Sequence, residues 1–273
     1  AEYITIFGKS WDFHVTDIIR TTLEDNISMI TESIEYLKKK GKKVFFDAEH
    51  FFDGYKNNSE YALSVLKAAE KAGADEIVLC DTNGGCFSDE IYEITKKVVE
   101  TVNIPVGIHC HNDMECAVAN SVSAVKAGAS QIQGTFIGIG ERCGNANLSA
   151  IIPSLKLKLR YDCAAVSELS NLTKMARYIA EVSNLVLADS KPYVGKSAFA
   201  HKGGMHVDGV RKNPKSFEHI SPEEVGNQRN FLLSEVSGRT VILSKLASIA
   251  PELSKDSIET IQISDILKEM EFK

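Results

Sequence analysis

Short apolar runs alternate with amphipathic segments along the first 160 residues of the chain. Five runs are apolar enough to be strands covered on both faces, and they lie at 3–8, 43–48, 76–81, 105–111 and 131–137. Between them, apolar residues recur at helical spacing, as in the stripe formed by Leu23, Ile27, Ile30, Ile34 and Leu37. Strand and helix patterns that alternate over short connections predict an α/β fold with parallel strands.

Local signals predict where several of these helices begin and end. Thr21 and Glu24 fit a capping box at the start of the first helix, and Gly41 follows its end. Ser88 is the expected N-cap of a later helix, and Asn147 is the expected N-cap of the helix that follows the fifth strand.

Chain length decides between a closed barrel and an open sheet. A (β/α)8 barrel takes about 250 residues, whereas the five βα units here fill 160 residues. No G-x-G-x-x-G follows a strand, which argues against a dinucleotide-binding fold. We therefore expect a partial (β/α)8 TIM barrel, corresponding to β4–β8 of the parent fold, with open edges that invite pairing.

The hydrophobic pattern changes after residue 160. Residues 166–188 read as one amphipathic helix, 192–206 are rich in glycine, and 221–273 return to helical patterns. We expect a partial TIM-barrel catalytic domain at 1–160, and a linker helix with small helical subdomains at 161–273.

Composition and charge narrow the class of protein. The 273 residues are 44% hydrophobic and 25% charged, which excludes disordered, collagen-like and coiled-coil chains. The net charge of −6 without a basic block argues against nucleic-acid and membrane partners. Six cysteines without a CxxC pair predict buried free thiols in a reducing cytoplasm, with a disulfide or a cysteine metal site as the alternative.

Two histidines end the fourth predicted strand. His109 and His111 are two positions apart, so both imidazoles point to one side of the strand. They are half of a metal site, which carboxylate or amide oxygens would complete; the alternative is a pair of ordinary polar residues. The loop 138–148 has three glycines around a Glu-Arg pair, so Asn145 is a candidate oxygen ligand, although an ordinary turn is also possible.

Four further residues are candidates for function, each with a structural alternative. Glu49 follows the second strand and is a candidate general base or a solvated loop acid. Thr82 follows Asp81 and offers a hydroxyl for substrate, unless this segment only forms an Asx turn. His201 and His206 lie in a glycine-rich stretch and are either functional or solvated loop residues.

Four motifs resemble those of a known superfamily. The segments GIHCHND at 107–113, GERCGNANL at 140–148 and AFAHKGGMH at 198–206 are similar to the DRE-TIM metallolyases. Within them, the chain resembles the Claisen-condensing acyltransferases, which are the 2-isopropylmalate, homocitrate and citramalate synthases. The segment FFDAEHFFDGYK at 45–56 resembles the (R)-citramalate synthase branch.

The resemblance implies an activity. It implies a condensation of acetyl-CoA with a 2-keto acid, most simply pyruvate to give (R)-citramalate, by a cytoplasmic homodimer that uses a divalent metal (Zn, Mn or Mg). The alternatives are another 2-keto acid, as in 2-isopropylmalate or homocitrate synthases, and an inactive fragment of such an enzyme.

The resemblance also implies roles for individual residues. His109 and His111 match the metal ligands, and Asn145 matches the nearby amide, which is expected to bind the metal and the substrate. Glu49 matches the candidate base, and Thr82 matches a hydroxyl near the keto-acid carboxylate. His206 matches a histidine that reaches into the partner's barrel.

The chain departs from the family pattern at one strand. The family's first strand carries Thr-Leu-Arg-Asp-Gly, whose arginine polarises the keto oxygen and whose aspartate binds metal; residues 21–26 are only superficially similar. We therefore expect weak metal binding and an inactive chain in isolation. Phe217 stands near a frequent tyrosine of the family. A lyase would lack the His201–His206 segment, and an amidohydrolase would need further histidines, so both alternatives fit less well.

Overall fold

The computed structural model describes residues 1–163, 168–232, 243, 246, 250–254 and 256–271. The chain divides into two compact units, Ala1–Leu155 and Lys156–Lys273; the functional domain boundary expected at 160 remains a prediction. In the described part of the chain, no helix is both long and apolar enough to cross a membrane.

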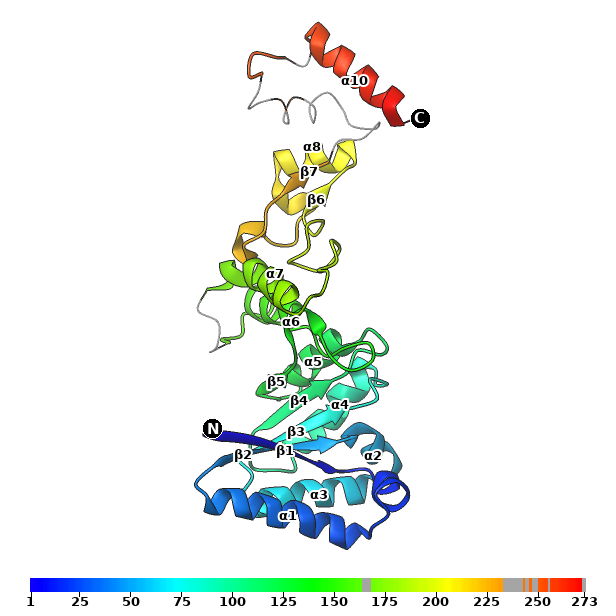
Figure 1. The fold of residues 1–273 in the computed structure, drawn as a ribbon, viewed down its shortest axis with the longest axis vertical. Helices are drawn as coiled ribbons and strands as arrows, with labels where there is room; N and C mark the ends of the chain where they lie inside the picture. The colour runs from blue at the N-terminus through cyan, green and yellow to red at the C-terminus, as the bar shows by residue number, and fades with distance from the viewer. Residues whose placement is uncertain (164–167, 233–242, 244–245, 247–249, 255, 272–273) are drawn as a thin grey trace. The chain divides into compact units, whose positions relative to one another are not determined.

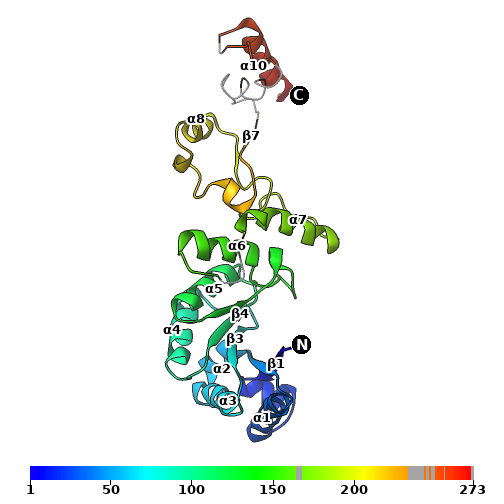
Figure 2. The same cartoon turned by 90° about the vertical axis from the view of Figure 1, so that its left-hand side faces the viewer.

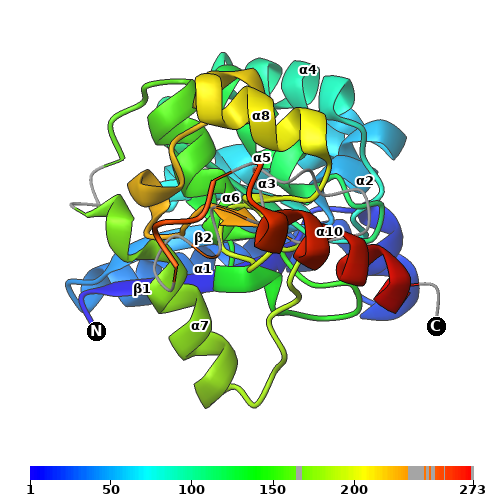
Figure 3. The same ribbon diagram turned by 90° about the horizontal axis from the view of Figure 1, so that it is seen from above.

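The first unit is built on a five-stranded parallel sheet whose strand order follows the chain order. The strands are β1 (Tyr3–Lys9), β2 (Lys43–Glu49), β3 (Glu76–Asp81), β4 (Val106–Cys110) and β5 (Gln131–Gln133). β1 directly follows the N-terminus and forms one edge of the sheet (Figure 3). Every strand pairs with the next one along the chain, which is barrel-type rather than doubly wound connectivity. The predicted α/β fold of five units is confirmed.

Helices connect the strands, and α1, α3 and α4 lie on one side of the sheet (Figures 1 and 2). The helices of this unit are α1 (Leu23–Lys39), α2 (Phe51–Asn57), α3 (Ser59–Lys71), α4 (Ser88–Val99), α5 (Ala117–Lys126) and α6 (Leu148–Pro153). Alternate strand residues are fully buried, as at Phe46 and Ala48 on β2 and Ile108 on β4. Burial of this apolar set drives the packing of the helices on the sheet.

β5 is shorter than the run predicted at 131–137. At Gly134 a β-carbon would lie 2.5 Å from the carbonyl oxygen of Ala146. Ile137 then has a φ of 55°, and the chain turns into the 3-10 segment η2 (Phe136–Gly138). The extended pairing ends because the chain folds back against the segment before α6.

The first predicted cap is wrong by one residue. Thr22, not Thr21, is the N-cap of α1, and its hydroxyl oxygen accepts the backbone N–H of Asp25 at 3.0 Å. The predicted stop is confirmed, because Gly41 follows α1 with a left-handed φ of 70°.

The second predicted cap is also wrong, and the third is confirmed. Phe87 precedes α4 as its N-cap, and its backbone N–H donates to the carboxylate of Glu90 at 2.9 Å. Ser88 donates instead to Asn120 Oδ1 at 2.8 Å. Asn147 caps α6 as predicted, since its Oδ1 accepts the N–H of Ser149 at 3.0 Å.

The second unit contains α7 (Leu172–Val182), α8 (Gly204–Lys212) and α10 (Ile258–Glu271), with a parallel pair formed by β6 (Ala200–His201) and β7 (Asn230–Phe231). The single helix predicted at 166–188 is shorter, and its positions 164–167 lie outside the described residues. The helical prediction for 221–273 fails before β7, where Gly226 has a φ of 66° and ends a 3-10 turn.

All six cysteines are free. Cys80, Cys86 and Cys110 are buried, as predicted, whereas Cys143 is exposed. Cys143 departs from the prediction because it lies in the glycine-rich loop and not in a strand.

Candidate functional site

Polar side chains occupy the sheet face opposite the helices, towards the carboxyl ends of the strands. They are Asp47 and Glu49 on β2, His109 and His111 at the end of β4, and Gln133 on β5. Side chains two positions apart on a strand point the same way, so each pair shares this face. Active sites of parallel barrels form at this end of the strands.

The structure brings the two predicted metal-site histidines together. The ring centroids of His109 and His111 are 5.2 Å apart. Nδ1 of His109 lies 2.9 Å from Gln133 Oε1, whereas Nδ1 of His111 is buried without a hydrogen-bond partner. Burial lowers the pKa of His111, and the charges of His109 and Arg142 act in the same direction. The neutral imidazole, which has a lone pair for a ligand bond, is therefore favoured at His111.

Asn145 lies beside His111, with which it forms an isolated antiparallel bridge. Its Nδ2 donates to the Ile139 carbonyl at 3.2 Å, and its Oδ1 is buried without a partner. A buried amide oxygen and a buried imidazole nitrogen that lack partners are groups that a cation would satisfy. Among the described residues, no group of three or more His, Cys, Asp and Glu side chains could hold a metal. A cation here would therefore depend on imidazole and amide ligands.

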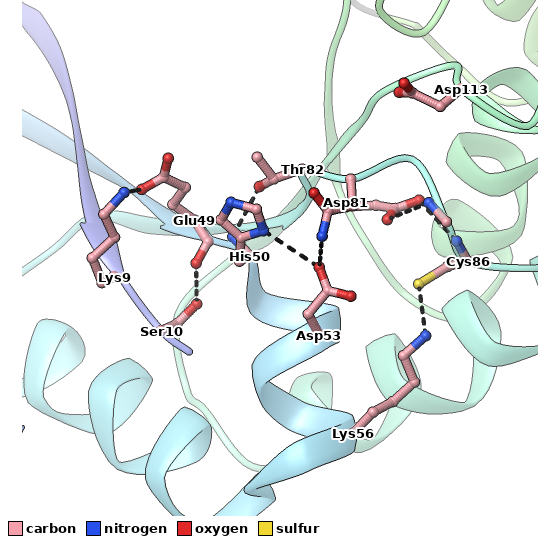
Figure 4. Close-up of polar contacts among 12 residues, drawn as sticks. Lys9, Ser10, Glu49, His50, Asp53, Lys56, Asp81, Thr82, Cys86 and Asp113 are labelled. Carbon is pink, nitrogen blue, oxygen red and sulfur yellow. Dashed lines mark hydrogen bonds and ion pairs between the residues drawn. The ribbon is translucent and has the colours of Figure 1, made fainter. Parts of the chain in front are cut away.

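Glu49 forms an ion pair with Lys9, the residue opposite it at the end of β1 (Figure 4). The side chain of Glu49 is 25% exposed and that of Lys9 is 18% exposed, so the pair is shielded but still reachable from solvent. Ser10 Oγ also donates to the Glu49 carbonyl at 2.7 Å. Sequence reasoning missed Lys9; the available signal was two adjacent strands that both end in a charged residue.

Thr82 follows β3 and ties together the ends of two strands (Figure 4). Its Oγ accepts the backbone N–H of His50 at 2.8 Å, which leaves the hydroxyl hydrogen to donate to a ligand. Its carbonyl oxygen accepts a hydrogen bond from Arg142 at 2.7 Å. The hydroxyl is thus held in a fixed position near Glu49.

The neighbouring Asp81 holds the β3–α4 loop with its side chain, but not as the Asx turn of the structural alternative, because it bonds residues four and five positions further on. Its carboxylate accepts the backbone N–H of Gly85 at 3.2 Å and that of Cys86 at 3.4 Å, and the residue is 1% exposed. Burial raises the pKa of Asp81, and these two hydrogen bonds oppose the rise. Asp81 shapes the β3–α4 loop and does not face a ligand.

Arg142 holds the glycine-rich loop in place. Its Nε and Nη2 bond both oxygens of Asp113, at 2.7 and 2.9 Å. This hydrogen bonding lowers the pKa of Asp113. The contact fixes the loop that carries Asn145 against the loop after β4.

An aromatic cluster that sequence reasoning missed lies behind Glu49. Trp11 stacks on His14 with centroids 5.2 Å apart, and His14 lies 4.1 Å from the ring of His50. Burial lowers the pKa of His14, as do the charges of His50 and Lys9. The only sequence signal was the spacing of Trp11 and His14 directly after a strand.

In the second unit, the two predicted histidines, His201 and His206, lie in different environments. His201 is buried, and its Nε2 lies 3.1 Å from the carboxylate of Glu218, which also pairs with Arg229. His206 is exposed at the start of α8 and stacks on Phe217 with centroids 4.1 Å apart. His201 is thus buried and paired with a carboxylate, whereas His206 is exposed.

Comparison with protein-family models assigns the chain to a known family. Residues 1–182 match the family model described as HMGL-like. The chain belongs to the HMGL-like family. Residues 193–271 match a second model, described as homocitrate synthase post-HMGL domain-like.

Curated members of the HMGL-like family align over nearly the whole chain. It is 56% identical over 269 residues to an (R)-citramalate synthase of Aquifex aeolicus, which covers 98% of this chain and 51% of that protein. It is 36% identical over 261 residues to a probable 2-isopropylmalate synthase of Methanopyrus kandleri, covering 96% and 51%. The chain spans about half the length of these curated relatives.

Solved structures share the fold. An HMG-CoA lyase of Bacillus subtilis superposes with a TM-score of 0.59 at 18% identity, over 68% of this chain and 65% of that one. A hydroxymethylglutaryl-CoA lyase of Pseudomonas aeruginosa gives 0.58 at 16% identity, over 68% and 64%. At this identity the likeness concerns the α/β barrel architecture alone.

Proposed function

We propose that the protein to which this chain belongs is a metal-dependent acyltransferase that condenses acetyl-CoA with pyruvate to give (R)-citramalate and CoA. The observation that carries the proposal is the 42–56% identity to five (R)-citramalate synthases. Identity to 2-isopropylmalate synthases is 36–40%, so condensation with a larger 2-keto acid is the second candidate. The buried free thiols support a cytoplasmic location.

His109, His111 and Asn145 would hold the divalent cation, which is zinc, manganese or magnesium in this proposal. The unpartnered Nδ1 of His111 and Oδ1 of Asn145 support it, because both atoms are buried acceptors without a donor. When bound, the cation supplies Lewis-acid polarisation of the keto oxygen.

Glu49 would remove a proton from the methyl group of acetyl-CoA. The electron pair of that C–H bond then attacks the keto carbon, and the keto oxygen becomes an alkoxide. Lys9 pairs with the Glu49 carboxylate before substrate binds and orients it. Hydrolysis of the thioester consumes water and releases CoA.

Thr82 would donate its free hydroxyl hydrogen to the carboxylate of the keto acid. The N–H of His50 already occupies the hydroxyl oxygen as an acceptor, so donation is the remaining role. His206 would act in a homodimer, as a proton donor or by positioning the acetyl thioester in the partner's site.

A thiol assay for released CoA tests the proposal. Pyruvate, 2-oxoisovalerate and 2-oxoglutarate are compared, on residues 1–273 and on a chain extended to the length of the curated relatives. Pyruvate is expected to give the highest kcat/KM, and activity is expected to disappear with a chelator. Higher kcat/KM with 2-oxoisovalerate would favour the second candidate, and CoA release without any condensation product would overturn both.

The variant Glu49→Gln tests the role of Glu49 as the base separately from its contribution to stability. Loss of the base is expected to lower kcat by about 10²–10⁴-fold without a change in thermal stability beyond that of the lost ion pair. Glu93→Gln, on the exposed surface of α4, is the matched control and should keep wild-type kcat. Equal activity of the two variants would contradict the role of Glu49.

A further inference from the structure

Three side chains from three different strands are hydrogen-bonded in series on the polar face of the sheet. Nε2 of Gln133 donates to Asp47 Oδ1 at 2.9 Å, and Oε1 of Gln133 lies 2.9 Å from Nδ1 of His109. Asp47 is on β2, His109 on β4 and Gln133 on β5, and all three are partly buried. Neither Asp47 nor Gln133 has a role in the proposed condensation described above.

The chemistry of the groups fixes the direction of the series. Gln133 donates to Asp47 through its NH₂ group, which leaves its amide oxygen on the side of His109. The amide oxygen of Gln133 then faces His109 and accepts from it. Nδ1 of His109 therefore carries the hydrogen, and Nε2 keeps the lone pair.

We propose that Gln133 is a positioning residue that holds His109 in the Nδ1–H tautomer, with Asp47 fixing the orientation of the Gln133 amide. The lone pair on Nε2 is thereby kept for the divalent cation, so this role rests on the proposed function. Metal-binding histidines generally donate their second nitrogen to such a partner, and losing it costs about 10–100-fold in metal affinity.

The residue two positions earlier on the same strand provides a matched control. Gln131 shares the face of Gln133, but its Oε1 is buried without a hydrogen-bond partner. A β-carbon on the adjacent Gly107 would lie 2.6 Å from this atom, so Gln131 is closely packed against β4. Substitution at Gln131 therefore perturbs packing without breaking the bond to His109.

The tautomer is measured by long-range ¹H–¹⁵N NMR of ¹⁵N-histidine-labelled protein, without metal and at a fixed, mildly alkaline pH. His109→Gln identifies the signals of His109. Wild-type protein and Gln131→Met are expected to show a protonated Nδ1 and an unprotonated Nε2. Gln133→Met should move His109 towards the Nε2–H form that free imidazole side chains prefer in water.

A second pair of variants tests Asp47 and provides a rescue. Asp47→Asn removes the acceptor that orients Gln133, so His109 should show a mixture of tautomers. Asp47→Asn combined with Gln133→Glu exchanges the carboxylate and the amide, and it should restore the Nδ1–H form. Restoration in the double variant is not expected of a merely structural role.

Calorimetry with Zn²⁺ and Mn²⁺, on the chain extended to the length of the curated relatives, separates this inference from the proposed function. Gln133→Met should weaken binding by about 10-fold or more, whereas Gln131→Met should match the wild type. An Nε2–H form in the wild type, or unchanged spectra in Gln133→Met, would overturn the positioning role. An altered tautomer with unaltered metal affinity would also overturn it. Absence of metal binding in every protein, with the expected tautomers, would instead overturn the proposed cation site.

Discussion

Gly144 lies at the tightest point of the glycine-rich loop. It has a φ of 95°, and a β-carbon there would lie 2.0 Å from the carbonyl oxygen of Gly138. Its own carbonyl oxygen accepts the backbone N–H of Asn112 at 2.9 Å, so the loop cannot shift without breaking that bond. The neighbouring Asn145 therefore depends on glycine at this position for its own placement.

Gly144→Ala is expected to destabilise the first unit by about 2 kcal/mol or more, because backbone strain adds to the clash. Chemical denaturation followed by circular dichroism measures the change. Gly85→Ala is the control, since nothing lies within 4 Å of its β-carbon position. A similar loss of stability in both variants would show that the clash at Gly144 is relieved by a small shift.

Glu218 is the most shielded ionised group described in the second unit, with a side chain that is 3% exposed. Burial alone would raise its pKa, but hydrogen bonds from Arg229 and His201 outweigh burial and lower it. The folded form thus holds the proton less tightly than the unfolded chain. The resulting stabilisation is present above the ordinary pKa of a glutamate and is lost as pH falls through the lower, folded value.

Glu218→Gln is therefore expected to reduce stability at pH 7 by about 2–3 kcal/mol and to flatten the decline of stability below about pH 4.5. Urea denaturation from pH 7 to pH 3 measures both effects. Arg229→Leu should flatten the decline of stability over the same pH range. The effects of the two substitutions on the free energy of unfolding should not be additive. Parallel pH curves for wild type and Glu218→Gln would contradict this explanation.

At the scale of elements, α1 starts at a different threonine from the one its sequence pattern indicates. The hydroxyl of Thr22 accepts the N–H of Asp25, whereas Thr21 lies before the N-cap and its hydroxyl donates to the Asp25 carboxylate at 3.4 Å. Thr22→Ala should cost about 1 kcal/mol, and Thr21→Ala should cost less than about 0.5 kcal/mol. Thermal denaturation of the two variants measures these losses of stability. A larger loss for Thr21→Ala than for Thr22→Ala would show that Thr21 is the N-cap.

The strands and helices of the first unit could be predicted because their signals are local. Stripes such as Ile30 and Ile34 depend only on spacing within one helix. The end of β5 could not be predicted, because it depends on the approach of the Ala146 carbonyl to Gly134, two positions that are distant along the chain. The N-cap of α1 could be predicted only to within one residue, because the adjacent Thr21 and Thr22 carry the same hydroxyl group.

The candidate site could be predicted in part for the same reason. His109 and His111 share a face by strand alternation alone. Gln133 and Asp47 could not be paired, because their strands are three positions apart in the sheet, about 14 Å if the sheet were flat. Their hydrogen bond requires a strongly curved sheet, and curvature belongs to the assembled molecule and not to any one segment.

At the scale of the whole molecule, His206 provides a test of the proposed homodimer. In the extended protein, His206→Asn should lower kcat by about 10²-fold, while KM for pyruvate changes little, since other groups bind pyruvate. Mixing this variant with His111→Ala should restore part of the activity, because mixed dimers contain sites with intact halves. If heterodimers form and no activity returns, His206 does not act across chains.

The agreement between strand order and chain order has a consequence for how the protein is made. Each strand finds its partner in the segment translated just before it, so the sheet can grow during synthesis without waiting for a distant part of the chain. The ribosome releases β1 before β2 and β2 before β3, and each new βα unit buries its apolar face on the one before. Assembly of these strands thus has a direction, from β1 to β5, that is set by their order in the sheet.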